Sequence, residues 1–159
     1  MPEAGFLKAS GHSADSRAVF DGNTGEWFTR AHLTSRVADF AGRLQFPRKA
    51  LGFLFPFNDS EGLIAYLAAI ETGHAVAMLN PELDEALRAR LIARFQPDFV
   101  IVPQSHALGI GGYREMESPH PGQVLLRTMT PNGYAIHDDL TLLISTSGST
   151  GSPKLVRLS

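Results

Sequence analysis

Between residues 29 and 102, three amphipathic helical patterns alternate with short, continuously apolar runs, and this alternation restricts the chain to an α/β fold. The apolar runs cover residues 50–55, 74–79 and 99–102, a pattern typical of strands that are covered on both faces. The order strand, helix, strand, helix, strand favours right-handed crossovers. We therefore predict a mostly parallel sheet flanked by helices.

Polar caps and helix-breaking residues mark the ends of the predicted helices. Thr29 is predicted to cap the first helix, Asn58 or Asp59 to cap the second, and Asp84 to lie in the first turn of the third. Gly73, which adopts a positive φ at low cost, is predicted to end the second helix. The helical faces expected to be buried are Leu33, Val37, Phe40, Ala41 and Leu44 in the first, Leu63, Ile64, Leu67 and Ala68 in the second, and Leu83, Leu87, Leu91, Ile92 and Phe95 in the third.

The rest of the chain divides into a predicted hairpin and a predicted loop-rich excursion. Residues 18–21 and 26–28 flank a glycine-rich turn and predict a β-hairpin. Residues 103–137 are rich in proline and glycine, and only 123–129 reads as a strand within them. A length of 159 residues is usual for one core, so residues 1–159 are predicted to form a single domain.

Composition excludes several classes of protein. Lys and Arg total 14 against 16 Asp and Glu, which lacks the basic character of a nucleic-acid-binding protein. No apolar run approaches the length of a membrane span, and cysteine is absent, so disulfides and thiolate metal sites are excluded. We predict a cytoplasmic protein with no membrane span.

The histidines and a run of phenylalanines have structural explanations. The histidines show no metal-ligand spacing, so no metal site is predicted. His74, at the start of a predicted strand, is expected to be a hydrogen-bonded structural residue, and surface or capping roles are expected for nearly all the others. Phe53, Phe55 and Phe57 alternate at strand spacing, which predicts packing in the sheet.

A segment rich in serine, threonine and glycine follows the predicted strand 139–146 and leads to Pro153 and Lys154, before another strand-like run at 155–158. Glycines let backbone N–H groups approach an anion, hydroxyls add donors, and the lysine adds a positive charge, a combination suited to polyphosphate. A flexible linker is the alternative, but a linker requires neither the buried strand nor Pro153-Lys154. The spacing does not match a Walker A loop, and no G-x-G-x-x-G motif follows the first strand.

The stretch from Leu142 to Val156 resembles the phosphate-binding signature of the AMP-forming acyl-CoA synthetases, within the adenylate-forming (AMP-dependent synthetase and ligase) superfamily. Residues 27–44, Asn58 with the helix after it, and residues 73–81 are also similar to that family. The resemblance implies a ligase that uses ATP and Mg²⁺ to convert a carboxylic acid, here a fatty or other organic acid, into an acyl-adenylate and pyrophosphate, with coenzyme A as the usual acceptor. It implies that the ATP phosphates are held by Thr146, Ser147, Gly148, Ser149, Thr150, Gly151 and Lys154.

Several parts of that family are not found in these residues. The glutamate linked to magnesium, the ribose-binding aspartate and the catalytic lysine would all lie beyond Ser159. The chain is therefore expected to be an N-terminal fragment of the AMP-binding domain, with no catalytic residue and no ligase activity by itself, and with an open sheet edge that promotes self-association. The alternative is a naturally short, non-catalytic module that uses a ligase-derived fold to bind an anion or a partner.

Overall fold

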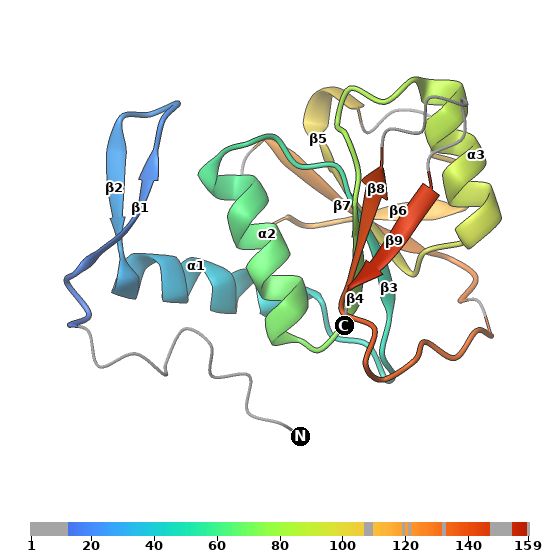
Figure 1. Ribbon diagram of the computed structural model, residues 1–159, viewed down its shortest axis with the longest axis horizontal. Helices are drawn as coiled ribbons and strands as arrows, with labels where there is room; N and C mark the ends of the chain where they lie inside the picture. The colour runs from blue at the N-terminus through green and yellow to red at the C-terminus, as the bar shows by residue number, and fades with distance from the viewer. Residues whose placement is uncertain are drawn as a thin grey trace.

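A seven-stranded sheet forms the centre of the computed structural model, which describes residues 13–106, 110–118, 120, 122–131, 133–146 and 154–158 (Figure 1). The helices are α1 Arg30–Arg43, α2 Ser60–Glu71 and α3 Glu85–Phe95, with a short 3-10 helix at Gln104–His106. The strands are β1 Arg17–Asp21, β2 Glu26–Thr29, β3 Leu51–Leu54, β4 Ala75–Met78, β5 Phe99–Pro103, β6 Tyr113–Met116, β7 Gln123–Thr128, β8 Leu142–Thr146 and β9 Lys154–Leu158.

The middle of the sheet is parallel, as the alternation of patterns predicted. Its order is β6-β7-β5-β3-β4-β8-β9, and β3 pairs in parallel with β4 and β5, as β4 does with β8. Antiparallel strands flank this centre, with β7 beside β5, β6 beside β7, and β9 beside β8. The predicted fold class, a mostly parallel sheet flanked by helices, is confirmed.

Each face of the sheet has its own hydrophobic core. On one face, α1 and α2 pack against residues that include Leu54, Val76 and Phe99. On the other face, α3 packs against Phe53, Val100 and their neighbours. Because side chains of a strand alternate between faces, the continuously apolar runs in the sequence supply both cores at once.

The predicted helix ends are largely those of the structure. The Thr29 side chain accepts a hydrogen bond from the backbone N–H of His32, and Asp59 accepts one from Gly62. Asp84 is the N-cap of α3 rather than a residue of its first turn. Gly73 has a φ of 74° at the end of α2, as predicted.

The buried face of α2 differs from the prediction. Ile64 and Ala68 are buried as expected, but Ala65 and Ala69 accompany them, whereas Leu63 and Leu67 are only half-buried. The first core therefore includes small side chains from α2. Spacing alone does not distinguish these neighbouring helical faces, because both follow the same period.

The sequence analysis missed a strand in the segment 103–137. The expected strand at 123–129 is β7, but β6 pairs with it along Tyr113–Met116. The central residues of β6, Arg114 and Glu115, are exposed, since β6 lies at the end of the sheet. An edge strand with polar residues lacks the apolar pattern by which the other strands were recognised.

Among the histidines that the structure describes, two are buried, although only one was expected to be internal. His74 is 4% exposed, and its ring contacts Ala50 N at 3.3 Å and Leu44 O at 2.7 Å, which confirms its structural role. His120 is 3% exposed, so the expectation of a surface or capping role was wrong for it. Burial lowers the pKa of both imidazoles.

His120 joins the segment between β6 and β7 to both helices of the first core. Arg36 on α1 donates from Nε to His120 Nδ1 at 3.1 Å and from Nη2 to Glu61 Oε1, on α2, at 2.7 Å. Burial has the largest effect on the pKa of His120 and lowers it; Glu61, the next in size, raises the pKa, and Arg36 lowers it. The cluster ties segments together that are far apart in the sequence.

Candidate phosphate-binding site

The four parallel strands β5, β3, β4 and β8 end at the same edge of the sheet. In open α/β sheets, ligands bind outside the carboxyl ends of the strands. β8 runs upward in Figure 1 and delivers the chain to this edge at Thr146. The segment that was predicted to bind phosphate therefore begins where ligands bind in folds of this kind.

The described backbone brings the two ends of the predicted phosphate-binding segment together. β9 pairs with β8 in antiparallel fashion, and Thr146 is the register partner of Lys154. Both residues thus lie at the base of the segment. The other predicted site residues lie outside the described residues: Ser147, Gly148, Ser149, Thr150 and Gly151. Their role in binding phosphate stays a prediction.

The position of β8 follows from its contacts with both cores. Leu142 packs against the core beneath α1 and α2, and Leu143 against the core beneath α3. Backbone pairing aligns these residues with Val76 and Ala77 of β4, which are both fully buried. Two opposed hydrophobic contacts and a parallel ladder therefore fix the strand that leads to the site.

Phe57 and His106 lie near each other in segments that follow two of these strands, and the sequence analysis missed this pair. Phe57 is 43% exposed, and its ring centroid lies 6.4 Å from that of His106. Phe53 and Phe55 are buried as predicted, but the expectation for Phe57 was wrong because β3 ends at Leu54 and Pro56 turns the chain. The proline immediately before Phe57 was the available signal.

Gly62 holds the first turn of α2 against the segment that leaves β3. A Cβ at Gly62 would lie 2.5 Å from the carbonyl oxygen of Phe57 and 2.7 Å from the Pro56 Cβ. Only glycine permits this approach without a shift of the backbone. Close packing of α2 therefore contributes to the geometry beside the carboxyl edge of β3.

Two acidic side chains, Asp59 and Asp21, are engaged in structure. Asp59 caps α2, and Asp21 accepts hydrogen bonds from the backbone of Asn23 and of Ser60. The hydrogen bond from the Ser60 side chain, followed by that from Asn23, lowers the pKa of Asp21. Within the described ranges, no group of three or more metal-ligating side chains is placed to hold a metal ion.

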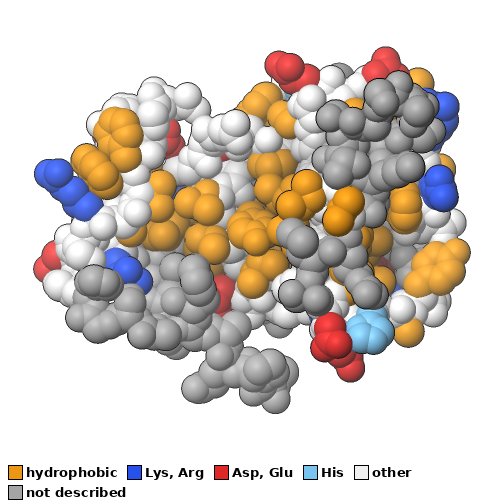
Figure 2. All heavy atoms as spheres, viewed as in Figure 1, with side chains coloured by type: hydrophobic (Ala, Val, Ile, Leu, Met, Phe, Trp, Pro, Cys, Tyr) orange, Lys and Arg blue, Asp and Glu red, His pale blue; other side chains and the backbone are white. Residues whose placement is uncertain are grey.

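The hydrophobic surface near the base of the site is partly uncovered. Ile144 and Val156 are register partners on β8 and β9, and they are 41% and 46% exposed. Figure 2 shows hydrophobic side chains gathered across the middle of the same face. The expected self-association through this edge stays a prediction.

In the part of the chain that the structure describes, no helix is both long enough and apolar enough to cross a bilayer.

Comparison with sequence families and curated proteins identifies relatives over most of the chain. The family model described as AMP-binding enzyme matches residues 6–159. The isonitrile lipopeptide synthase of Streptomyces coeruleorubidus is 30% identical over 141 residues, which are 84% of this chain and 10% of that protein. Nonribosomal peptide synthetase 7 of Aspergillus fumigatus is 31% identical over 98 residues, 58% of this chain and 4% of that protein. The chain thus spans a tenth or less of these curated relatives.

Solved structures share the fold over nearly the whole chain. ATP-bound MatB from Rhodopseudomonas palustris matches with a TM-score of 0.73 at 21% identity, covering 98% of this chain and 34% of that chain. A malonyl-CoA ligase with methylmalonyl-CoA and AMP bound matches with a TM-score of 0.67 at 25% identity, covering 98% of this chain and 32% of that chain. The chain therefore corresponds in fold to about a third of each of these enzymes.

Proposed function

The chain belongs to the AMP-binding enzyme family, whose members form adenylates, and from this premise we propose that residues 146–154 bind the β- and γ-phosphates of ATP during activation of a carboxylic acid. The observation that carries the proposal is the pairing of Thr146 with Lys154 at the carboxyl edge of the parallel strands. The hydroxyl and glycine residues between them supply donors for a polyphosphate.

The proposed reaction joins an acid to ATP. A carboxylate oxygen attacks the α-phosphorus, the bond to the bridging oxygen of the β-phosphate breaks, and pyrophosphate leaves with the electron pair. Donors placed around the β- and γ-phosphates stabilise the charge that develops on the leaving group. Lys154 contributes a full positive charge to this set.

Mg²⁺ is the metal that the family resemblance implies, and it would screen phosphate charge when bound. The glutamate linked to it is expected outside residues 1–159, as are the ribose-binding aspartate and the catalytic lysine. We therefore propose that residues 1–159 alone catalyse no turnover, and that the activity belongs to a protein in which the remaining groups are present.

The acceptor is a thiol, and two candidates have support. A fold shared with a malonyl-CoA ligase favours coenzyme A, and a fatty or other organic acid as substrate. Relatives named as a lipopeptide synthase and a peptide synthetase favour the thiol of a carrier protein. Thioester formation, measured with coenzyme A and with a thiol-bearing carrier protein in parallel, separates the two.

The test of the phosphate site is ATP–pyrophosphate exchange with a panel of carboxylic acids, in the natural protein that contains these residues. Lys154→Ala should lower the exchange rate about 100-fold, because a donor to the developing charge is lost. Arg90 is an exposed residue of α3, so Arg90→Ala is the control and should leave exchange unchanged. Unchanged exchange in Lys154→Ala would refute the assignment.

A further inference from the structure

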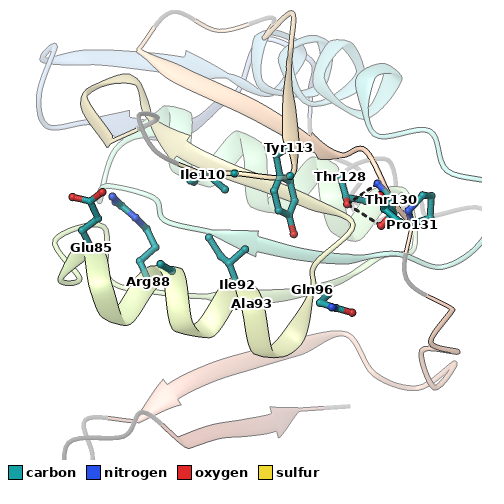
Figure 3. A pocket seen from close by; sticks show the side chains of 13 residues that line it. Glu85, Arg88, Ile92, Ala93, Gln96, Ile110, Tyr113, Thr128, Thr130 and Pro131 are labelled. Atoms are coloured by element: carbon teal, nitrogen blue, oxygen red, sulfur yellow. Dashed lines mark hydrogen bonds between the residues drawn. The ribbon is translucent and has the colours of Figure 1, made fainter.

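A cavity of about 570 Å³ lies between α3 and the segments that begin β6 and follow β7 (Figure 3). This volume is typical of sites for small organic molecules. Its walls come from three parts of the chain and include Arg88, Ile92, Ile110, Tyr113, Thr128 and Thr130. The lining residues that the structure describes come from none of β3, β4, β8 and β9, whose ends form the candidate phosphate-binding site.

Arg88 gives one end of the cavity an unusual chemical character. The residue is 6% exposed, and Nη1 of its guanidinium is buried without a hydrogen-bond partner among the described residues. Arginine is rarely buried in this way unless it is paired. In Figure 3 its side chain rises from α3 and leans toward the end of the cavity that holds Glu85. The guanidinium beside the cavity therefore carries a buried N–H group that lacks an acceptor.

The middle of the cavity wall is mainly apolar. Ile92 on α3 and Ile110 opposite supply aliphatic surface, and the Tyr113 ring stands between them and the Thr128 end (Figure 3). The Tyr113 hydroxyl donates to the carbonyl oxygen of Pro97 at 2.7 Å, which fixes the ring. Burial raises the pKa of Tyr113 to about 12, so the hydroxyl remains protonated and keeps this bond at neutral pH.

We propose that this cavity binds a small organic monocarboxylate, with the carboxylate on Arg88 and an apolar body against Ile92, Ile110 and Tyr113. A carboxylate matches the guanidinium in charge and geometry. Glu85 also lines the Arg88 end and is exposed. Its negative charge disfavours a second negative charge on the ligand, so a monocarboxylate fits better than a dicarboxylate or a phosphate.

The test uses 4-fluorophenylacetate as the probe and ¹⁹F NMR titration as the measurement, with the neutral 4-fluorophenylacetamide in parallel. The acid should bind with a Kd of about 1 mM or tighter, and the amide at least about tenfold more weakly, which corresponds to about 1.4 kcal/mol. Arg88→Gln should weaken binding of the acid by at least the same factor, because the charge-assisted bond is lost.

Three further substitutions on α3 distinguish loss of the site from loss of the fold. Ala89 lines the cavity and is exposed, so Ala89→Trp should fill the cavity and abolish binding without disturbing the core. Ala86→Trp, at an exposed position of the same helix outside the cavity lining, is its matched control and should bind normally. Arg90→Gln is the matched control for Arg88→Gln and should bind the acid normally, since Arg90 is exposed and is not among the described lining residues.

The outcomes separate this site from the phosphate site. Loss of binding in Arg88→Gln and Ala89→Trp, with normal binding in both controls and in Lys154→Ala, supports the proposal. Equal affinity for acid and amide, or unchanged affinity in Ala89→Trp, would overturn it, as would the absence of binding at about 10 mM acid. Pyrophosphate exchange need not change in any α3 variant, so the two proposals can fail independently.

Discussion

Substitution of Gly52 by alanine should destabilise the protein, although the change is small and lies in a regular strand. Gly52 on β3 is the register partner of Phe99 on β5, and an added Cβ would lie 2.2 Å from Cζ of the Phe99 ring. The ring has little room to withdraw. It is fully buried, with the Phe46 ring centroid 5.5 Å away on one side and the His74 ring centroid at 5.9 Å.

Two opposing effects set the size of the loss. Overpacking a close-packed core typically costs about 1–3 kcal/mol. Alanine also restricts the unfolded chain relative to glycine, which returns about 0.4–1 kcal/mol. The net loss should be about 1–2 kcal/mol, which corresponds to a decrease in Tm of roughly 2–8 °C for a domain of this size.

Urea unfolding of the purified protein measures this loss as a lower midpoint at an unchanged m value. Gly42→Ala is the control, because Gly42 lies in α1 with open space around its Cβ position and should gain about 0.5–1 kcal/mol. Phe99→Leu should relieve the clash, so a double-mutant cycle with Gly52→Ala should show a favourable coupling of at least about 0.5 kcal/mol. Wild-type stability of Gly52→Ala, or additivity with Phe99→Leu, would refute the argument.

Two further predictions concern buried polar groups. Burial holds the pKa of His74 below its ordinary value of 6.5, so the unfolded state binds a proton first as the pH falls. The free energy of unfolding should therefore decrease below about pH 6.5. Urea titrations at about pH 7.5 and 5.5 measure this dependence, and His74→Gln should weaken it. Asp98 is 2% exposed and accepts hydrogen bonds from Leu51 N at 2.9 Å and Arg48 Nη2 at 2.8 Å. Asp98→Ala should therefore lower the free energy of unfolding by about 1.5–3 kcal/mol, measured by thermal unfolding. A loss under about 0.5 kcal/mol would contradict this prediction.

The elements that were predicted correctly are those whose signal is local. α2 and α3 carry an apolar helical period with a cap adjacent in sequence, and β3, β4 and β5 are short, continuously apolar runs. The strand β6 carries neither pattern, because its exposed residues need no apolar partner. His120 was missed for a different reason. Its partner Arg36 lies 84 positions earlier, so its burial depends on tertiary packing that no local pattern contains.

The candidate site was predictable in composition but only partly in geometry. The hydroxyl and glycine segment, its lysine and the strand before it are visible in the sequence. The register that pairs Thr146 with Lys154 is not, since it arises when β9 returns alongside β8. Phe57 shows the limit of periodicity, because strand spacing continues through it although the strand has already ended.

The pairing of β8 with β9 also sets how a phosphate could be stabilised here. In a Walker A site the loop leads into a helix, whose N-terminus contributes partial positive charge and backbone donors. Here residues 147–153 lead into a strand, β9, so no helix begins directly after them. On the proposed function, the segment therefore supplies positive charge through Lys154 rather than through a helix that follows it. Lys154→Arg preserves that charge, so it should retain more pyrophosphate exchange than Lys154→Ala. Equal losses of exchange in the two variants would show that the site does not depend on the charge of this residue.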